Sequence, residues 1–163
     1  MRNPIIAAVA AVLLFASPAV AQSDLEARRA AAHALIDASL ASFLNDSAPN
    51  QRAQLAALPG IKPSERAALN KAFDEGFPAM VREAQDFAAN AVADEWPLEQ
   101  LQDPSNVDEA RLDALIARME PTMTAVGERF AFKVVQTGCS ADAEPSVACT
   151  RILTAIRGRE AAR

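Results

Sequence analysis

The chain has 163 residues, of which 51% are hydrophobic, and a formal net charge of −5 at pH 7. This length is enough for one domain with a continuous core. The acidic balance argues against nucleic acid as a partner, because phosphate binding requires concentrated lysine and arginine. The charge is unevenly spread, since Asp74–Glu120 is strongly acidic and Arg129–Arg163 is basic. We expect these faces to pair within the fold or to be solvated; the alternative is a basic C-terminal end that contacts anionic lipid or an acidic partner.

Residues 1–21 have the three-part layout of a cleavable secretory signal. A short basic start precedes an apolar run over Ile5–Ala16, and small residues precede a cleavage site between Ala21 and Gln22. The apolar stretch is interrupted by a proline and is shorter than the ~20 residues that a membrane-spanning helix needs. The sequence therefore predicts that residues 22–163 form a single periplasmic domain with no transmembrane segment.

Helix is favoured almost everywhere, because alanine dominates, glycine numbers only five and tyrosine is absent. A capping box over Ser23–Glu26 predicts the start of a first helix, and apolar residues recur at helical spacing as far as Leu44. The polar run Asn45–Asn50, which contains a proline, predicts a break. A short helix is expected over Gln51–Ala57, and the Leu58-Pro59-Gly60 segment ends it.

The next apolar stripe begins near Pro63 and continues to Trp96 without losing phase at Pro78. This continuity predicts one long helix with a bend at the internal proline. The Trp96-Pro97 pair ends that helix, and Leu98 and Leu101 indicate a short helical turn in the connection that follows.

A second long helix is expected to start at a cap formed by Ser105 or Asn106 and to end near Gly138. Its apolar phase also survives an internal proline, Pro121. The short join between the two long helices favours antiparallel packing, and a last helix is expected over Ser146–Arg157. The predicted fold class is all-α: an up-and-down bundle of four to five helices with two long, proline-bent, antiparallel helices.

The chain contains two cysteines, Cys139 and Cys149. In an exported protein an even count indicates a disulfide bond, whereas a redox-active pair would usually lie two residues apart at a helix start. Chain-entropy reasoning assigns about 3 kcal/mol to a bridge that closes a loop of this size. We expect a structural bridge that pins the last helix to the end of the long one.

Motifs for common chemistries are absent: the sequence has no glycine-rich phosphate loop, no nucleophile elbow and no calcium loop. His33 is the only histidine, and Asp37 lies one helical turn further on. This pair would need further ligands to hold a metal, or a serine or cysteine nucleophile to catalyse a reaction. We interpret His33 as an ordinary helix residue.

Acidic pairs occur at Asp74-Glu75, Asp94-Glu95 and Asp108-Glu109. Paired carboxylates can act as acid and base in glycoside hydrolysis. The last two pairs flank the same connection and could face each other, but acids beside a helix N-terminus are explained by its dipole. We therefore expect a protein that is not an enzyme, with no catalytic residue, no cofactor and no metal.

Large apolar side chains on the two long helices could line a slot between them, because prolines in facing helices splay a bundle. An ordinary core is the alternative interpretation of the same stripe. The candidate pocket residues are Phe73, Phe77, Met80, Phe87, Met119, Met123 and Phe130.

The layout resembles a family of small proteobacterial periplasmic, all-helical proteins of unknown function. The resemblance rests on the signal, the alanine-rich first helix and the segment Leu115–Met123. The Phe-Tyr-x-Ser-Pro-x-Gly motif that often precedes this segment in the family is missing. The resemblance implies a helical fold and no known chemistry.

The leading hypothesis for function is a non-enzymatic binding module that recognises a periplasmic protein through a helical face. The alternative is a carrier that holds a small apolar ligand between the bent helices. The sequence does not determine the oligomeric state.

Overall fold

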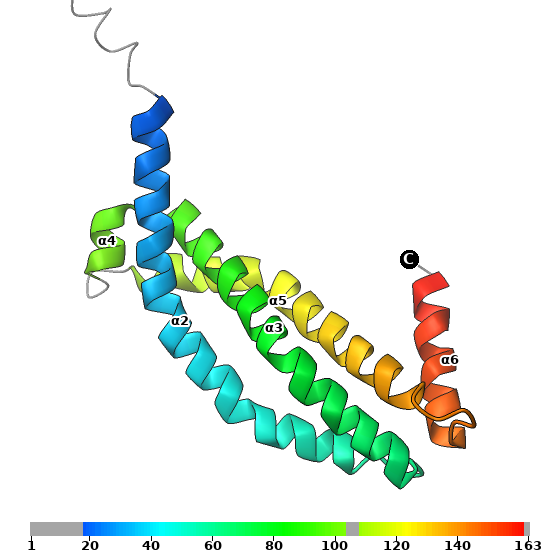
Figure 1. Ribbon diagram of the computed structural model, residues 1–163. Helices are drawn as coiled ribbons and strands as arrows, with labels where there is room; N and C mark the ends of the chain where they lie inside the picture. The colour runs from blue at the N-terminus through cyan, green and yellow to red at the C-terminus, as the bar shows by residue number, and fades with distance from the viewer. Residues whose placement is uncertain (1–17, 104–107, 162–163) are drawn as a thin grey trace, which may run out of the picture.

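The computed structural model describes residues 18–103 and 108–161, and this part of the chain contains helices and no strand. The helices are α2 (Pro18–Ala56), α3 (Pro63–Glu95), α4 (Leu98–Gln102), α5 (Glu109–Cys139) and α6 (Val147–Ala161). The long helices alternate in direction along the chain (Figure 1), which confirms the predicted all-α, up-and-down bundle. None of the described helices combines the length and the hydropathy that crossing a bilayer would require.

α3 is the central helix, and both α2 and α5 pack along it (Figure 1). The apolar side chains form two separate clusters along this helix. We call the first the tryptophan-end cluster, in which Trp96 and Leu101 are buried against small side chains of α2 and α3. Alanines at positions 32, 89 and 93 are completely buried there, so α2 and α3 approach closely at this end. The buried members of this cluster are Ala32, Ala89, Val92, Ala93, Trp96, Leu101 and Leu115.

The second cluster, at the opposite end of α3, surrounds the two cysteines, and we call it the disulfide-end cluster. Phe73, Phe77 and Phe130 form its aromatic centre, with ring centroids between 5.2 and 6.0 Å apart. The side chains of this cluster are larger than the alanines at the other end. Its buried members are Ile61, Leu69, Phe73, Phe77, Met80, Val81, Ala84, Val126, Val134, Cys139 and Cys149.

The predicted break at Asn45–Asn50 is wrong, because α2 continues through it as one helix to Ala56. The polar residues of this run mostly face solvent, whereas Leu44, Ala48 and Leu55 continue the apolar stripe onto the disulfide-end cluster. Burial of that stripe outweighs the single backbone hydrogen bond that the proline at position 49 removes. The structure therefore has three long helices with an internal proline, rather than the two that were predicted.

Two predicted helix starts also differ from the structure. α2 is already helical from Pro18, so the predicted capping box at Ser23 lies inside the helix, because the preceding residues are good helix formers. The predicted caps of α5 lie outside the described residues, and the observed cap is Asp108. Its carboxylate accepts hydrogen bonds from the backbone N–H groups of Ala110 (2.9 Å) and Arg111 (3.5 Å).

The last helix, α6, spans Val147–Ala161 and so ends four residues beyond the predicted Arg157. The predicted boundaries of α3 and α4 are confirmed. α3 spans Pro63–Glu95 without interruption at its internal proline, and the turn predicted around Leu98 is α4. Gly60 has φ +76°, a conformation that glycine adopts readily, and it lies in the turn that separates α2 from α3. The predicted cleavage site after Ala21 falls within α2, and most of the predicted signal lies outside the described residues. Removal of the signal stays a prediction.

Candidate functional site

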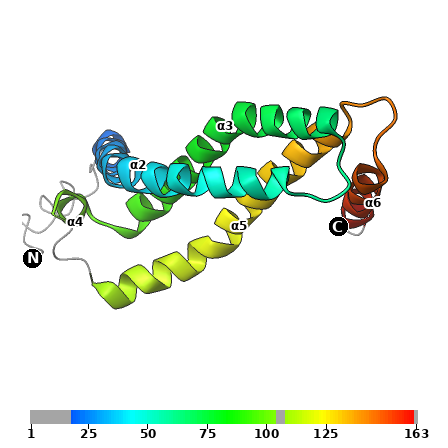
Figure 2. The same cartoon turned by 90° about the horizontal axis from the view of Figure 1, so that it is seen from below.

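An open groove of about 400 Å³ lies between α2 and α5, with α3 as its floor. In Figure 2 α2 runs between the traces of α3 and α5 in the middle of the bundle. We call this feature the α2–α5 groove. Its walls are apolar: α2 and the turn after it contribute Leu44, Leu55 and Leu58, and α5 contributes Met123, Val126 and Phe130.

The lining of the α2–α5 groove contains no charged residue, although 23% of the whole chain is charged. Its polar groups are the side-chain amides of Gln51 and Gln54, which are exposed on α2. The opposite wall presents small residues, because Gly127 and Ala131 are exposed on α5. A side chain at position 127 would project into open space, since a Cβ there meets nothing within 4 Å.

The seven candidate pocket residues do not all lie in one pocket. Four of them line the α2–α5 groove: Phe73, Met80, Met123 and Phe130. Phe77 is buried on another side of the disulfide-end cluster, Met119 packs on the tryptophan-end cluster, and Phe87 is half-buried. The wall formed by α2 was not predicted, because a break in the helix was expected at Asn45–Asn50.

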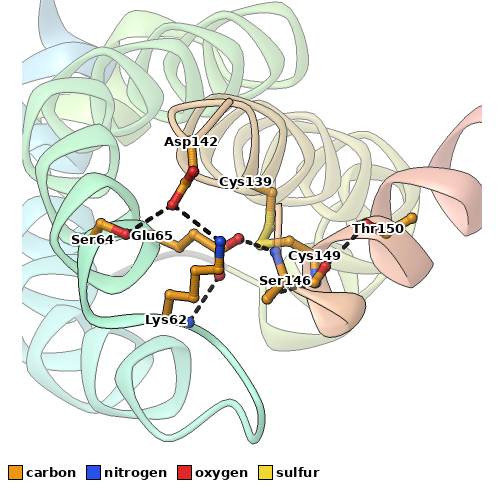
Figure 3. The surroundings of a disulfide bond; sticks show 8 residues. All are labelled: Lys62, Ser64, Glu65, Cys139, Asp142, Ser146, Cys149 and Thr150. Atoms are coloured by element: carbon orange, nitrogen blue, oxygen red, sulfur yellow. Dashed lines mark hydrogen bonds and ion pairs between the residues drawn. A yellow bond between two sulfur atoms is a disulfide. The ribbon is translucent and has the colours of Figure 1, made fainter. Parts of the chain in front are cut away.

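Hydrogen bonds and an ion pair around the disulfide connect the start of α3 with the segment between α5 and α6 (Figure 3). Cys139 and Cys149 are bonded as predicted, with Cα atoms 5.2 Å apart, and both side chains are completely buried. Ser146 caps α6, because its Oγ accepts a hydrogen bond from the backbone N–H of Cys149 (3.1 Å). The bridge therefore joins the last turn of α5 to the first turn of α6.

Glu65 is the charged residue at the centre of this region, and its side chain is completely buried. Its carboxylate accepts hydrogen bonds from the backbone N–H of Ser146 (2.6 Å) and of Lys62 (2.9 Å), so one side chain bridges the starts of α3 and α6. Burial alone raises the pKa of Glu65, but these hydrogen bonds outweigh burial and lower the pKa below its ordinary value.

Asp142, in the turn between α5 and α6, makes the second tie to α3. Its carboxylate accepts hydrogen bonds from Ser64 Oγ (3.1 Å) and Lys62 Nζ (3.4 Å), and from the backbone N–H of Glu144 (3.0 Å). The bond from Glu144 lowers the pKa of Asp142 most, and Ser64 and Lys62 lower it further against the opposing effect of burial. Together these contacts hold the turn between α5 and α6 against the start of α3.

His33 lies on α2 beside α3, away from the groove. Its Nδ1 is 3.3 Å from Asp37 Oδ1, as the helical spacing predicted, and its Nε2 is 3.8 Å from Asp86 Oδ1 of α3. Within the described residues no group of three or more His, Cys, Asp or Glu side chains is arranged to hold a metal ion. The contacts of His33 are those of a residue that links two helices.

Several of the acids in the three pairs make contacts that hold helices together. Glu95 contacts Arg118 (2.5 Å) and Arg111 (2.8 Å) of α5, and these bonds lower the pKa of Glu95. Asp74 of α3 pairs with Arg52 of α2 at 2.7 Å. Asp108 caps α5, as described above. The contacts seen for Asp74, Glu95 and Asp108 are therefore structural.

In comparisons with known proteins, no family model, curated protein or solved structure matches this chain. The resemblance to periplasmic helical proteins stays a prediction.

Proposed function

We propose that the protein is a non-enzymatic binding module that seats an amphipathic helix of a partner protein in the α2–α5 groove. The observation that carries this proposal is the uncharged, apolar lining of an open groove at a position where a bundle would hold one more helix. Large apolar surfaces exposed on a soluble domain usually mark binding sites, and charged residues are depleted at the centres of interfaces.

The length of the groove fits three turns of helix. Its α5 wall runs from Met123 to Val134 and its floor on α3 from Phe73 to Ala84. At about 1.5 Å per residue each of these segments extends over about 16 Å. An amphipathic helix with apolar residues at positions i, i+3 or i+4, and i+7 presents its anchors over a comparable length.

The two rims favour a helix over an extended peptide. Gly127 and Ala131 leave room for close approach of a second backbone, as small residues do where helices cross. The methionines at positions 80 and 123 have flexible, polarisable side chains that adapt to different apolar partners. A rim of glutamine amides supplies hydrogen bonds to the polar flank of the bound helix.

Selection from a library of random helical peptides tests this proposal. The protein is the bait, and the Gly127→Phe variant, whose new ring fills the groove, is the counter-selection target. We expect selected peptides to carry the i, i+3 or i+4, i+7 apolar pattern and to bind the variant at least tenfold more weakly. The matched control is Gly158→Phe, because position 158 on α6 also faces open space and lies outside the groove.

A selection that yields only peptides insensitive to Gly127→Phe would contradict the proposal. A second variant, Ala131→Arg, places a charge on the same wall and should weaken the same peptides. Circular dichroism of each variant establishes that the helices are retained.

The alternative function is transport of a small apolar ligand in the same groove. It is supported by the volume of about 400 Å³, which lies within the usual range of ligand pockets. Native mass spectrometry of the gently purified protein should then detect a small-molecule adduct that the Gly127→Phe variant lacks.

We also propose that the protein works in the periplasm after removal of residues 1–21. The disulfide supports this location, because such bridges persist in oxidising compartments. The intact mass of protein recovered from the periplasm should correspond to a chain that begins at Gln22; a mass that retains residues 1–21 would contradict this.

A further inference from the structure

Large apolar side chains are exposed at three positions in the described part of the chain: Phe43, Ile116 and Val147. Phe43 of α2 is 69% exposed and Ile116 of α5 is 51% exposed. Ile116 precedes the groove residue Met123 by seven residues, and Phe43 precedes the groove residue Gln54 by eleven. Both spacings are close to whole numbers of helical turns, so each side chain lies on the face of its helix that forms a wall of the α2–α5 groove.

The apolar walls of the groove therefore continue toward the tryptophan-end cluster, to which Leu115 beside Ile116 belongs. From Ile116 to Val134 the wall on α5 extends over about 27 Å, at about 1.5 Å per residue. Exposed apolar surface of this extent is typical of an interface, because its contact with water is unfavourable. A helix of about five turns would cover it, whereas the groove alone accommodates about three.

The charged residues of α5 make different contacts on its two sides. Its arginines at positions 111 and 118 both pair with Glu95 of α3. Arg129 pairs with Glu83 of α3 in the same way. These three cations are therefore engaged by α3.

Asp113 and Glu120 are acids beside the extended wall on α5. Asp113 lies three residues before Ile116, and Glu120 lies three residues before Met123, so each is next to an apolar wall residue on the helix surface. Both acids are exposed, and neither has a hydrogen bond or an ion pair with another described residue. No basic residue is among the groove lining. The rim on α5 therefore carries negative charge that the described part of the chain leaves unpaired.

We propose that the α2–α5 groove recognises a basic amphipathic helix of about five turns. This inference rests on the proposed function and adds the length and the charge of the partner helix. The apolar anchors of that helix lie along the walls from Ile116 to Val134, and lysine or arginine residues on one flank face Asp113 and Glu120. The apolar contacts supply most of the affinity, and the charge pairs at the rim select the partner and speed its association.

Two stapled helical peptides of about 18 residues test the charge of the partner. They share leucines at positions i, i+3 or i+4, and i+7, and they carry either lysines or glutamates on the flank. Fluorescence anisotropy with the full chain measures both dissociation constants. We expect the lysine peptide to bind about tenfold more tightly at low salt. This preference should fall toward onefold at about 1 M salt, where exposed charges are screened within about 3 Å.

Two double variants locate the charge effect. Asp113→Asn with Glu120→Gln should reduce the preference for the lysine peptide to about twofold or less. Glu26→Gln with Asp46→Asn is the matched control, because it removes two exposed acids of α2 that do not line the groove. The control makes the same change in net charge and should leave the preference unchanged.

A shorter lysine peptide of about 11 residues, which covers the groove alone, tests the length of the partner. Phe43→Ser with Ile116→Ser should weaken binding of the longer peptide about fivefold or more and leave binding of the shorter peptide unchanged. Val147→Ser is the control, because Val147 is also exposed but lies on α6. It should alter neither affinity.

The outcomes separate this inference from the proposed function. Equal binding of the lysine and glutamate peptides, with both sensitive to Gly127→Phe, would overturn the inference and leave the proposed function in place. A preference for lysine that survives replacement of Asp113 and Glu120 would do the same. Binding of neither peptide, or binding that Gly127→Phe does not weaken, would contradict both. A dimer of the protein alone that Gly127→Phe dissociates would assign the groove to a second copy and overturn the inference.

Discussion

At the scale of single residues, Glu65 shows how a buried charge can be accommodated. A carboxylate removed from water would ordinarily become protonated, because desolvation disfavours the charged form. Here the backbone N–H groups of Lys62 and Ser146 point at the two carboxylate oxygens. Their combined effect is a lowered pKa, so the residue stays charged at neutral pH and joins two helix starts.

The lowered pKa predicts a particular dependence of stability on pH. Because the pKa is lower in the folded than in the unfolded protein, Glu65 contributes stability in full above its ordinary pKa of 4.5. That contribution is lost as the pH falls from this value toward the folded pKa.

The free energy of unfolding of Glu65→Gln should therefore be about 1–3 kcal/mol lower than that of the wild type at pH 7. Between pH 3 and pH 5 it should also change less with pH than that of the wild type. Urea unfolding between pH 3 and pH 7 measures both effects. If the free energy of unfolding of the variant falls as steeply with decreasing pH as that of the wild type, the lowered pKa of Glu65 is refuted. Some pH dependence should remain, since Asp142 and Glu95 also have lowered pKa values.

At the scale of elements, the spacing of α3 and α5 is set by a glycine at one end. Gly138 is buried where α5 ends, and a Cβ there would lie 2.5 Å from Leu69 Cδ2 and 2.8 Å from Leu69 Cα. The backbone of α3 cannot withdraw from this contact easily, because the disulfide and Glu65 hold the same region. The two helices are therefore close here and further apart at the groove.

Gly138→Ala should destabilise the protein by about 1–3 kcal/mol through overpacking, even though alanine is the better helix former. Gly158→Ala on α6 is the control, because a Cβ there meets nothing within 4 Å. We expect Gly158→Ala to leave stability unchanged or to raise it by up to about 1 kcal/mol. Thermal unfolding of both variants measures the difference; equal stabilities would contradict the close contact.

At the scale of the whole molecule, α2 and α5 pack on α3 in a bundle that is held at both ends and has an open groove in the middle. The alanine-rich contacts of α2 and the ion pairs of Glu95 hold the tryptophan end. The disulfide, Glu65 and Asp142 hold the opposite end. The α2–α5 groove lies between these two regions.

Removal of the disulfide tests whether this bond stabilises the end of the bundle formed by α6 and the end of α5. Replacement of Cys139 and Cys149 by alanine should lower the free energy of unfolding by about 3 kcal/mol. Hydrogen exchange should accelerate most in α6 and the end of α5, and least around Trp96. Uniform acceleration along the chain would contradict a local role.

The helical class, the boundaries of α3 and the pairing of the cysteines could be predicted, because helical periodicity, proline restriction and cysteine chemistry are local signals. The continuity of α2 through Pro49 could not, since burial of Leu55 against residues distant in the sequence decides it. The groove was only partly predictable for the same reason: Met123 and Phe130 carried an apolar signal, whereas the wall on α2 depends on tertiary packing. The hydrogen bond from Ser146 to Glu65 joins residues that are far apart in the chain, and no sequence pattern predicts it.

The central claim is that the α2–α5 groove seats an amphipathic helix, and photo-crosslinking in the producing cell tests it most directly. A photoreactive amino acid at Gln54, on the rim, should yield one major crosslinked protein, joined through an amphipathic helical segment, and Gly127→Phe should abolish the product. The same amino acid at Lys71, which is exposed and outside the groove, should not yield it. Equal products from Gln54 and Lys71, or a Gln54 product that survives Gly127→Phe, would contradict the account.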